Sequence, residues 1–235
     1  MVAHRSADGR NTWLDSYLDQ MLTRDTGILD ARRNVQKMRR YFSALALSTA
    51  GIPLDKTLID AADVNAKTGA AYESLFADMF VAEQIPAWTS NRLARLIRAP
   101  KRYIVDPALA VAASSLTAAG ILNDPDLLGR TLDTFAMAQL RVEVALSPKR
   151  RRLHHLRTKE GRQEIDVIVE LDDGKVLGIE FKASAAVTRR DAVHLEWLRD
   201  NLGERFRFGA VVHTGPDVFM LGDRIIAVPL CAMWG

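Results

Sequence analysis

The sequence predicts an α+β fold, in which a helical region at residues 1–124 is followed by a domain with a mixed β-sheet at residues 125–235. Two observations predict it. Apolar residues recur at helical spacing through most of the first half, whereas the second half follows the order helix, three strands, helix, strand. The boundary is placed near residues 120–125, where an alanine-rich stretch ends. A chain of 235 residues can bury the core of one large domain or two small ones.

The first half of the chain is predicted to be mostly helical. One apolar stripe at helical spacing is expected to face the core and consists of Trp13, Tyr17, Met21 and Leu22. Three further helices are predicted at residues 39–50, 54–62 and 66–80. Asn65 is the expected N-cap of the last of these. Residues 107–122 are interpreted as one buried, alanine-rich helix, which is too short and too polar to span a membrane.

The helices at 54–62 and 66–80 are spaced like a helix-turn-helix, and strands at 81–85 and 102–105 would supply a wing. The sequence therefore predicts a winged-helix-like region. The second helix begins with Lys67 but continues with Glu73 and Asp78, which would repel a phosphate backbone. We interpret this region as a packing or partner-docking module rather than a reader of DNA.

The elements of the second half follow from local signals. A helix is predicted at residues 127–146, followed by a basic strand at 151–157. A second helix, at 189–202, is expected to be capped by Thr188 and to end at Gly203. Buried strands are expected after it, at residues 208–212 and 224–228.

Between these helices lies the most informative feature, a predicted β-hairpin. A three-residue loop at 172–174, with Gly174 in the left-handed conformation, would place Leu171 opposite Lys175. Asp166 then lies opposite Glu180, and by the same count Glu164 lies opposite Lys182. A two-residue turn would instead shift the register by one residue and separate the carboxylates between the two faces.

Two opposed carboxylates beside a lysine suggest a cation site, because like charges directly opposite each other destabilise a sheet. Carboxylate oxygens suit Mg²⁺, which completes its shell with water and substrate phosphate. Lys182 would then neutralise developing phosphate charge or position the attacking water. The alternative is a solvated strand face on which Lys182 makes an ordinary ion pair with Asp166 or Glu164.

The order of the elements, with Asp on the second strand and Glu-x-Lys on the third, resembles the restriction-endonuclease-like fold of the PD-(D/E)XK nuclease superfamily. A series of sequence blocks along nearly the whole chain narrows the resemblance to one family. In chain order, the blocks are Arg24-Asp25 at the end of a helix containing Trp13 and Tyr17, then 99–106, Gly129 at the start of a helix, 161–166 and 179–184. Together they resemble domain of unknown function 4143, the C-terminal module of bacterial and archaeal P-loop (AAA-type) ATPases. This resemblance implies a winged-helix-like region followed by a nuclease-like αβββαβ domain.

The resemblance also implies roles for individual residues. Asp166 and Glu180 would ligate the metal, with Asp133 as an outer ligand, and Lys182 would assist hydrolysis. Asp133 stands where the family has Glu, and Gln139 stands at a later acidic position. No G-x-x-x-x-G-K-[ST] phosphate loop occurs, so we expect no ATP site and no ATP hydrolysis by this chain. The ATPase half of these proteins is expected to be missing from this chain. A natural stand-alone form, a truncated gene and an excised segment are the three alternative origins.

Basic residues border the carboxylate pair although the net charge is only +3. A nucleic-acid contact is therefore predicted for Arg150, Arg151, Arg152 and Arg157. Local ion pairing with neighbouring acidic residues is the alternative. The single Cys231 and the absence of a secretory signal or membrane span favour a cytoplasmic protein.

Three functions follow from these observations. The first is Mg²⁺-dependent phosphodiester hydrolysis of DNA or RNA. The second is a nucleic-acid-associated module without turnover. The third is a catalytically inactive regulatory or protein-interaction domain that partners an ATPase.

Overall fold

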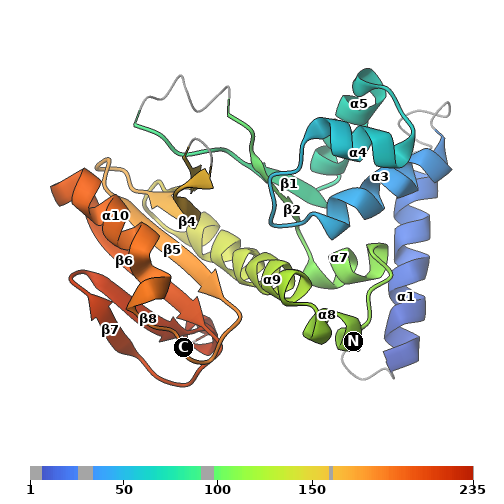
Figure 1. Ribbon diagram of the computed structural model, residues 1–235. Helices are drawn as coiled ribbons and strands as arrows, with labels where there is room; N and C mark the ends of the chain where they lie inside the picture. Colours follow the sequence, from blue (N-terminus) through green and yellow to red (C-terminus); the bar gives the residue numbers. More distant parts are fainter. Residues whose placement is uncertain (1–6, 26–33, 91–97, 159–160, 235) are drawn as a thin grey trace. The chain divides into compact units, whose positions relative to one another are not determined.

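The computed structural model of the protein describes residues 7–25, 34–90, 98–158 and 161–234. Its contacts divide the chain into two compact units (Figure 1). The first unit consists of Met1–Gln84 and Arg102–Thr134, and the second consists of Ile85–Lys101 and Phe135–Gly235. The first unit therefore extends past the predicted boundary at residue 124, and the segment Ile85–Lys101 is grouped with the sheet domain.

The first unit is built from helices. Its helical elements are α1 (Ala7–Gln20), the π-helical turn η2 (Met21–Asp25), α3 (Val35–Leu47), α4 (Asp55–Ala62), α5 (Ala66–Asp78), α7 (Pro107–Ala113), α8 (Ala118–Asn123) and the start of α9 (Pro125–Leu146). Asn65 caps α5, where its side chain accepts a hydrogen bond from the Thr68 N–H at 2.8 Å, as predicted. Asp63 ends α4 in the left-handed conformation, which turns the chain sharply into α5. The predicted pair of neighbouring helices is thereby confirmed.

Two predictions for the first unit are wrong in detail. Met21 and Leu22 are buried, but Trp13 and Tyr17 are 40% and 43% exposed and stack on each other. Residues spaced by four drift around a helix by about 40° per step, so a stripe that is buried at Met21 faces away by Trp13. Residues 107–122 form two short helices, α7 and α8, rather than one. Thr117 caps α8 through Gly120 N–H, and such local hydrogen bonds compete with continuous helix.

Two sheets are present in the described part of the chain. The short strands β1 (Ala82–Ile85) and β2 (Lys101–Ile104) pair with each other. The second unit contains a mixed sheet in the order β3-β4-β5-β6-β8-β7, made of β3 (Arg152–Arg157), β4 (Glu164–Glu170), β5 (Val176–Lys182), β6 (Phe206–His213), β7 (Phe219–Gly222) and β8 (Ile225–Pro229). Strands β3, β4 and β5 are antiparallel neighbours, whereas β5, β6 and β8 run parallel. This confirms the predicted α+β class with a mixed sheet; β7 was not predicted.

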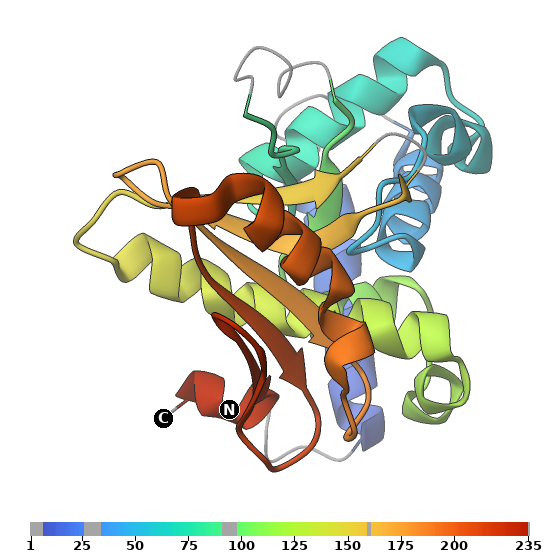
Figure 2. The same ribbon diagram turned by 60° about the vertical axis from the view of Figure 1, so that its left-hand side comes forward.

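Helix α10 (Val193–Leu202) connects β5 to the parallel strand β6 and lies across one face of the sheet (Figure 2). It is preceded by the 3-10 turn η4 (Arg189–Ala192), in which Thr188 and Asp191 form a capping box, and Gly203 ends it with φ +55°. A Cβ at Gly178 would lie 2.7 Å from Leu195, so glycine lets α10 approach β5 closely. Short 3-10 turns, η5 (Gly203–Arg205) and η6 (Leu230–Trp234), complete the unit.

A membrane span requires a helix of sufficient length and apolarity. Among the described residues, every helix is too short or too polar to cross a bilayer.

Candidate active site

The turn between β4 and β5 has the predicted three-residue form. Leu171 N–H donates to Lys175 O at 2.8 Å, and Gly174, with φ +76°, donates to Leu171 O at 3.1 Å. Val167 lies opposite Ile179 and Glu170 opposite Val176, which is the register of the three-residue loop. The two-residue turn is thereby excluded, because it would shift every one of these pairs.

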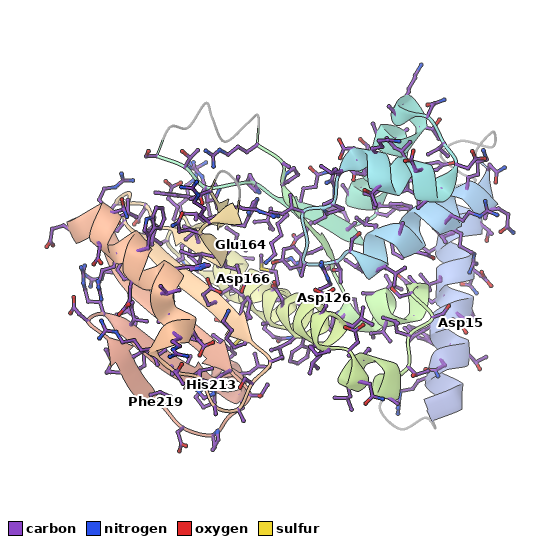
Figure 3. All side chains as sticks on the ribbon, viewed as in Figure 1. Asp15, Asp126, Glu164, Asp166, His213 and Phe219 are labelled. Atoms are coloured by element: carbon purple, nitrogen blue, oxygen red, sulfur yellow. The ribbon has the colours of Figure 1, made fainter. Side chains whose placement is uncertain are left out.

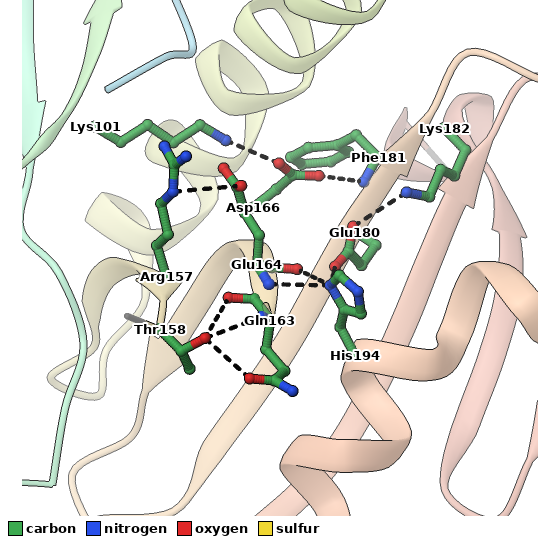
Figure 4. Close-up of polar contacts among 10 residues, drawn as sticks. All are labelled: Lys101, Arg157, Thr158, Gln163, Glu164, Asp166, Glu180, Phe181, Lys182 and His194. Atoms are coloured by element: carbon green, nitrogen blue, oxygen red, sulfur yellow. Dashed lines mark hydrogen bonds and ion pairs between the residues drawn. The ribbon is translucent and has the colours of Figure 1, made fainter. Parts of the chain in front are cut away.

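The regular ladder between β4 and β5 ends where the carboxylates begin. Beyond Val167 and Ile179, the Phe181 N–H donates to the Asp166 carboxylate, with Oδ2 2.9 Å away (Figure 4). The side chain of Asp166 is therefore fixed against the neighbouring strand by a backbone donor. The predicted opposition of Glu164 and Lys182 lies beyond this ladder. Figure 3 shows Glu164 and Asp166 on β4 within the second unit.

The other oxygen of Asp166 faces a buried lysine. Lys101 Nζ lies 2.9 Å from Oδ1, and the Lys101 side chain is 4% exposed while that of Asp166 is 21% exposed. Burial raises the pKa of Asp166, but the charge of Lys101 and the hydrogen bond from Phe181 together lower it further, so the net shift is downward. Asp166 is consequently held in its ionised form.

Glu180 is placed differently. Lys182 Nζ lies 3.4 Å from its Oε2, and its side chain is 7% exposed. Its Oε1 is buried and has no hydrogen-bond partner among the described residues, although His194 Nδ1 lies 4.0 Å away. Burial, followed by the negative charge of Asp166, raises the pKa of Glu180 well above its ordinary value despite the nearby ammonium of Lys182. One buried acceptor in the site is therefore left open.

The structure thus brings together Asp166, Glu180 and Lys182 from two neighbouring strands. It adds two residues that sequence reasoning missed. Lys101 carries one signal that could have found it, because it and Arg102 begin a short strand that is otherwise apolar, and buried basic residues need charged partners. His194 carries no such signal; its Nδ1 contacts the backbone of Glu164 at 3.0 Å from N and 2.6 Å from O.

The remaining predicted residues lie elsewhere or on the surface. Asp133 belongs to the first unit, is buried, and accepts a hydrogen bond from the Tyr103 hydroxyl at 2.9 Å. Its role as an outer ligand stays a prediction. The basic side chains proposed for nucleic acid are all exposed, namely Arg150, Arg151, Arg152 and Arg157. Of these, Arg157 lies 3.7 Å from Glu164, which is the local ion pairing weighed as the alternative.

The residues present fit a Mg²⁺ ion as far as their donor chemistry goes. In the described part of the chain, no group of three or more His, Cys, Asp or Glu could hold a metal. Mg²⁺, however, is commonly held by one or two carboxylates together with water and substrate phosphate. Asp166 and Glu180 supply two carboxylates, and the open Oε1 of Glu180 is a buried acceptor that a cation would satisfy.

Comparison with protein families gives a match for each half of the chain. The model of domain of unknown function DUF8612 matches residues 1–120, and that of domain of unknown function DUF4143 matches residues 128–233. The chain belongs to the DUF8612 family, and its second half is similar to DUF4143, a domain of unknown function. The expected resemblance to the latter along nearly the whole chain is corrected, because the first half matches a separate domain.

Two mycobacterial proteins are similar to this chain. They carry the names "Uncharacterized protein Mb2031c", from Mycobacterium bovis, and "Uncharacterized protein Rv2008c", from Mycobacterium tuberculosis. Each is 28% identical over 225 residues, which cover 96% of this chain and 49% of the relative. The chain therefore spans about half the length of these curated relatives. No solved structure matches it.

Proposed function

We propose that the second unit is a restriction-endonuclease-like domain that hydrolyses phosphodiester bonds of DNA or RNA with the help of Mg²⁺. The observation that carries this proposal is the meeting of Asp166 and Glu180 on adjacent strands, beside Lys182, with Glu180 Oε1 buried and unpartnered among the described residues. An unsatisfied buried acceptor is costly and is a common mark of a functional site.

The chain order supports the same class. Helix α9 precedes the antiparallel strands β3, β4 and β5, and α10 then leads to β6, which is parallel to β5. This is the αβββαβ order that the sequence resemblance implies. The acidic residues lie at the start of β4 and the end of β5, where the regular ladder between these strands has ended.

In this proposal the chain supplies binding and charge. A Mg²⁺ ion held by Asp166 and Glu180 would polarise the phosphate and lower the pKa of a bound water. Before the ion binds, Phe181 N–H and Lys101 keep Asp166 ionised and oriented. Lys182 is 35% exposed, so its ammonium can reach a substrate phosphate oxygen and stabilise negative charge as it develops. The exposed arginines at 150–152 and Arg157 would hold the phosphate backbone outside the site.

For the first unit we propose a winged-helix-like role in packing or partner docking. Its support is the pair α4 and α5, joined by a sharp turn, together with the two-stranded β1-β2 sheet. Glu73 on α5 is occupied by Arg102, at 2.7 Å, rather than presented to a nucleic acid.

A second candidate is a catalytically inactive regulatory or protein-interaction domain that partners an ATPase. The observation that favours it is charge balance, because Lys101 and Lys182 already oppose the two carboxylates without a metal. The DUF4143 match agrees with this candidate, because DUF4143 is known as a C-terminal module of ATPases.

The test is a cleavage assay on the purified chain with single- and double-stranded DNA and RNA, in Mg²⁺ or Mn²⁺. We expect cleavage by the wild type and its loss, by at least about 100-fold, in Asp166→Asn and Lys182→Met. Matched controls are Asp172→Asn and Lys175→Met, at and beside the turn of the same hairpin, which should retain activity. Circular dichroism checks folding. Equal background cleavage in all variants would eliminate the nuclease and favour the regulatory module.

A further inference from the structure

Lys101 is an unusual lysine for its degree of burial. Its residue is 3% exposed, and its ammonium lies 2.9 Å from Asp166 Oδ1. Charged lysines are almost never this buried unless they are paired. The pair joins residues 65 positions apart in the chain. It therefore connects the segment Ile85–Lys101 to the start of β4 within the second unit.

The backbone around Lys101 is fixed to the same unit. Ala99 O lies 3.2 Å from His155 Nε2, and Arg98 Nη1 donates to Arg157 O at 3.1 Å. Further back in this segment, Trp88 N–H donates to His155 O at 2.6 Å. These contacts attach the segment to β3, the neighbour of β4. Lys101 is consequently delivered to Asp166 by a supported backbone, unlike a flexible lysine on the surface.

The position of Lys101 conflicts with a metal ion on the same carboxylate. Mg²⁺ lies about 2.1 Å from its oxygen ligands. With Lys101 Nζ 2.9 Å from Oδ1, a metal on that oxygen and the ammonium would be at most about 5 Å apart. Two cations so close repel strongly where little water screens them. The other oxygen, Oδ2, is already engaged by Phe181 N–H.

We propose that Lys101 is a built-in counter-cation of Asp166, which a divalent ion must displace in order to bind. Lys101 is thus a positioning residue that keeps the carboxylate ionised and oriented while the metal is absent, and it lowers the affinity of the site for the metal. This inference rests on the proposed metal site at Asp166 and Glu180. It adds a competitor that neither the family matches nor the predicted ligand set includes.

Displacement has a reciprocal consequence. If Lys101 weakens metal binding, the metal must weaken the Lys101–Asp166 pair by the same factor. Lys101 should then be released from its buried position when the metal binds. The weakening of metal binding by Lys101 can be measured on a variant, and the release of Lys101 by the metal can be measured independently on the wild type.

The first experiment is calorimetric titration of the full chain with Mn²⁺ in the absence of nucleic acid. Lys101→Met should bind Mn²⁺ about 10-fold more tightly than the wild type, within the usual range of coupling between sites. Lys101→Arg, which keeps the charge, should remain weak, and the control Lys175→Met should match the wild type. Asp166→Asn should abolish Mn²⁺ binding both in the wild type and in combination with Lys101→Met. A merely structural lysine would give the opposite result for Lys101→Met, weaker or unchanged binding.

The outcomes separate the two proposals. Equal or weaker binding by Lys101→Met, with binding retained by the wild type, overturns the counter-cation and leaves the metal site standing. Absence of Mn²⁺ binding in the wild type and in Lys101→Met overturns both.

The second experiment needs no variant, so it decides the question even if Lys101→Met does not fold. The wild type is treated with an amine-reactive reagent with and without Mn²⁺, and labelling of each lysine is read by mass spectrometry. Mn²⁺ should raise labelling of Lys101 several-fold and leave labelling of the half-buried Lys175 unchanged. Unchanged or reduced labelling of Lys101, at Mn²⁺ concentrations that saturate the site, would show that the ammonium is not displaced.

Discussion

Each unit of the protein buries a basic residue among carboxylates, and the two clusters differ in how completely they are paired. In the first unit, Arg102 is 5% exposed and donates to Glu73, to Asp55 and to Pro53 O. Gln84 supplies a further donor to Glu73 at 2.7 Å. In the second unit, Asp166 is similarly engaged, but Glu180 Oε1 has no partner among the described residues.

This difference separates a structural cluster from the cluster that we propose to be functional. A saturated buried network stabilises one conformation, whereas a buried acceptor without a donor costs free energy that only a ligand or a proton can recover. The planar guanidinium of Arg102 suits the first task because it presents several fixed donors. The lysines of the second cluster are point charges without such a fixed set of donors, which agrees with our proposal that a divalent cation displaces one of them.

The largest expected change in stability comes from a substitution that disrupts the fully paired Arg102 cluster. Arg102→Met should lower the free energy of unfolding by about 3–5 kcal/mol, because it leaves Glu73 poorly solvated and without its main partner. Chemical denaturation measures this change. The control is Arg207→Met on β6, an exposed position where we expect a change within about 0.5 kcal/mol. If both variants unfold alike, the Arg102 cluster is not the stabilising one.

The next effect is pH dependence in the second unit. Burial, more than any other cause, lowers the pKa of His155 from 6.5 to about 4, although its contact with Ala99 O opposes the shift. The unfolded chain therefore binds a proton at His155 more readily than the folded protein does. The contribution of His155 to the free energy of unfolding should be fully present above pH 6.5 and should be lost as the pH drops towards 4. The loss attributable to this one group is at most about 3.4 kcal/mol.

The variant His155→Gln isolates this contribution. Its amide nitrogen can still donate to Ala99 O but does not titrate. The free energies of unfolding of the wild type and the variant should therefore converge as the pH falls from 6.5 towards 4. Only in the wild type does protonation of residue 155 in the unfolded chain lower the free energy of unfolding over this range. Parallel pH profiles would contradict the assignment to His155.

Replacing either carboxylate of the second unit, Asp166 or Glu180, by its neutral amide should change stability in opposite directions. Both variants are measured with a chelator present, so that no metal contributes. Asp166→Asn should lower stability at neutral pH by about 2 kcal/mol, because it weakens charged hydrogen bonds from Lys101 and Phe181. Glu180 has a raised pKa, so the wild type loses stability as the pH rises above 4.5. Glu180→Gln should escape this loss and become relatively more stable with rising pH, while losing cleavage. Thermal denaturation from pH 5 to 8 compares them; destabilisation by both substitutions would erase the distinction.

Local signals predicted part of this arrangement. The Asp172-Asp173-Gly174 turn fixed the register that brings Asp166 and Glu180 to adjacent strands, because turn geometry is set by a few neighbouring residues. The Lys101–Asp166 pair was not predicted, because its members are 65 positions apart and no periodicity links them. The exposure of Trp13 escaped prediction for a related reason, since which face of α1 is buried depends on what packs against it.

The smallest expected effect concerns a predicted local contact, and it provides a scale for the buried clusters. Asn65→Ala removes the cap hydrogen bond to Thr68 N–H at 2.8 Å, and should lower the free energy of unfolding by about 1 kcal/mol. Asn65→Ser retains an acceptor and should lose much less. The cap acts at an exposed helix end, where water can replace the lost partner, whereas the Glu73 side chain beside Arg102 is only 17% exposed. If denaturation showed Asn65→Ala to be as costly as Arg102→Met, burial would not be what distinguishes the Arg102 cluster from an ordinary surface hydrogen bond.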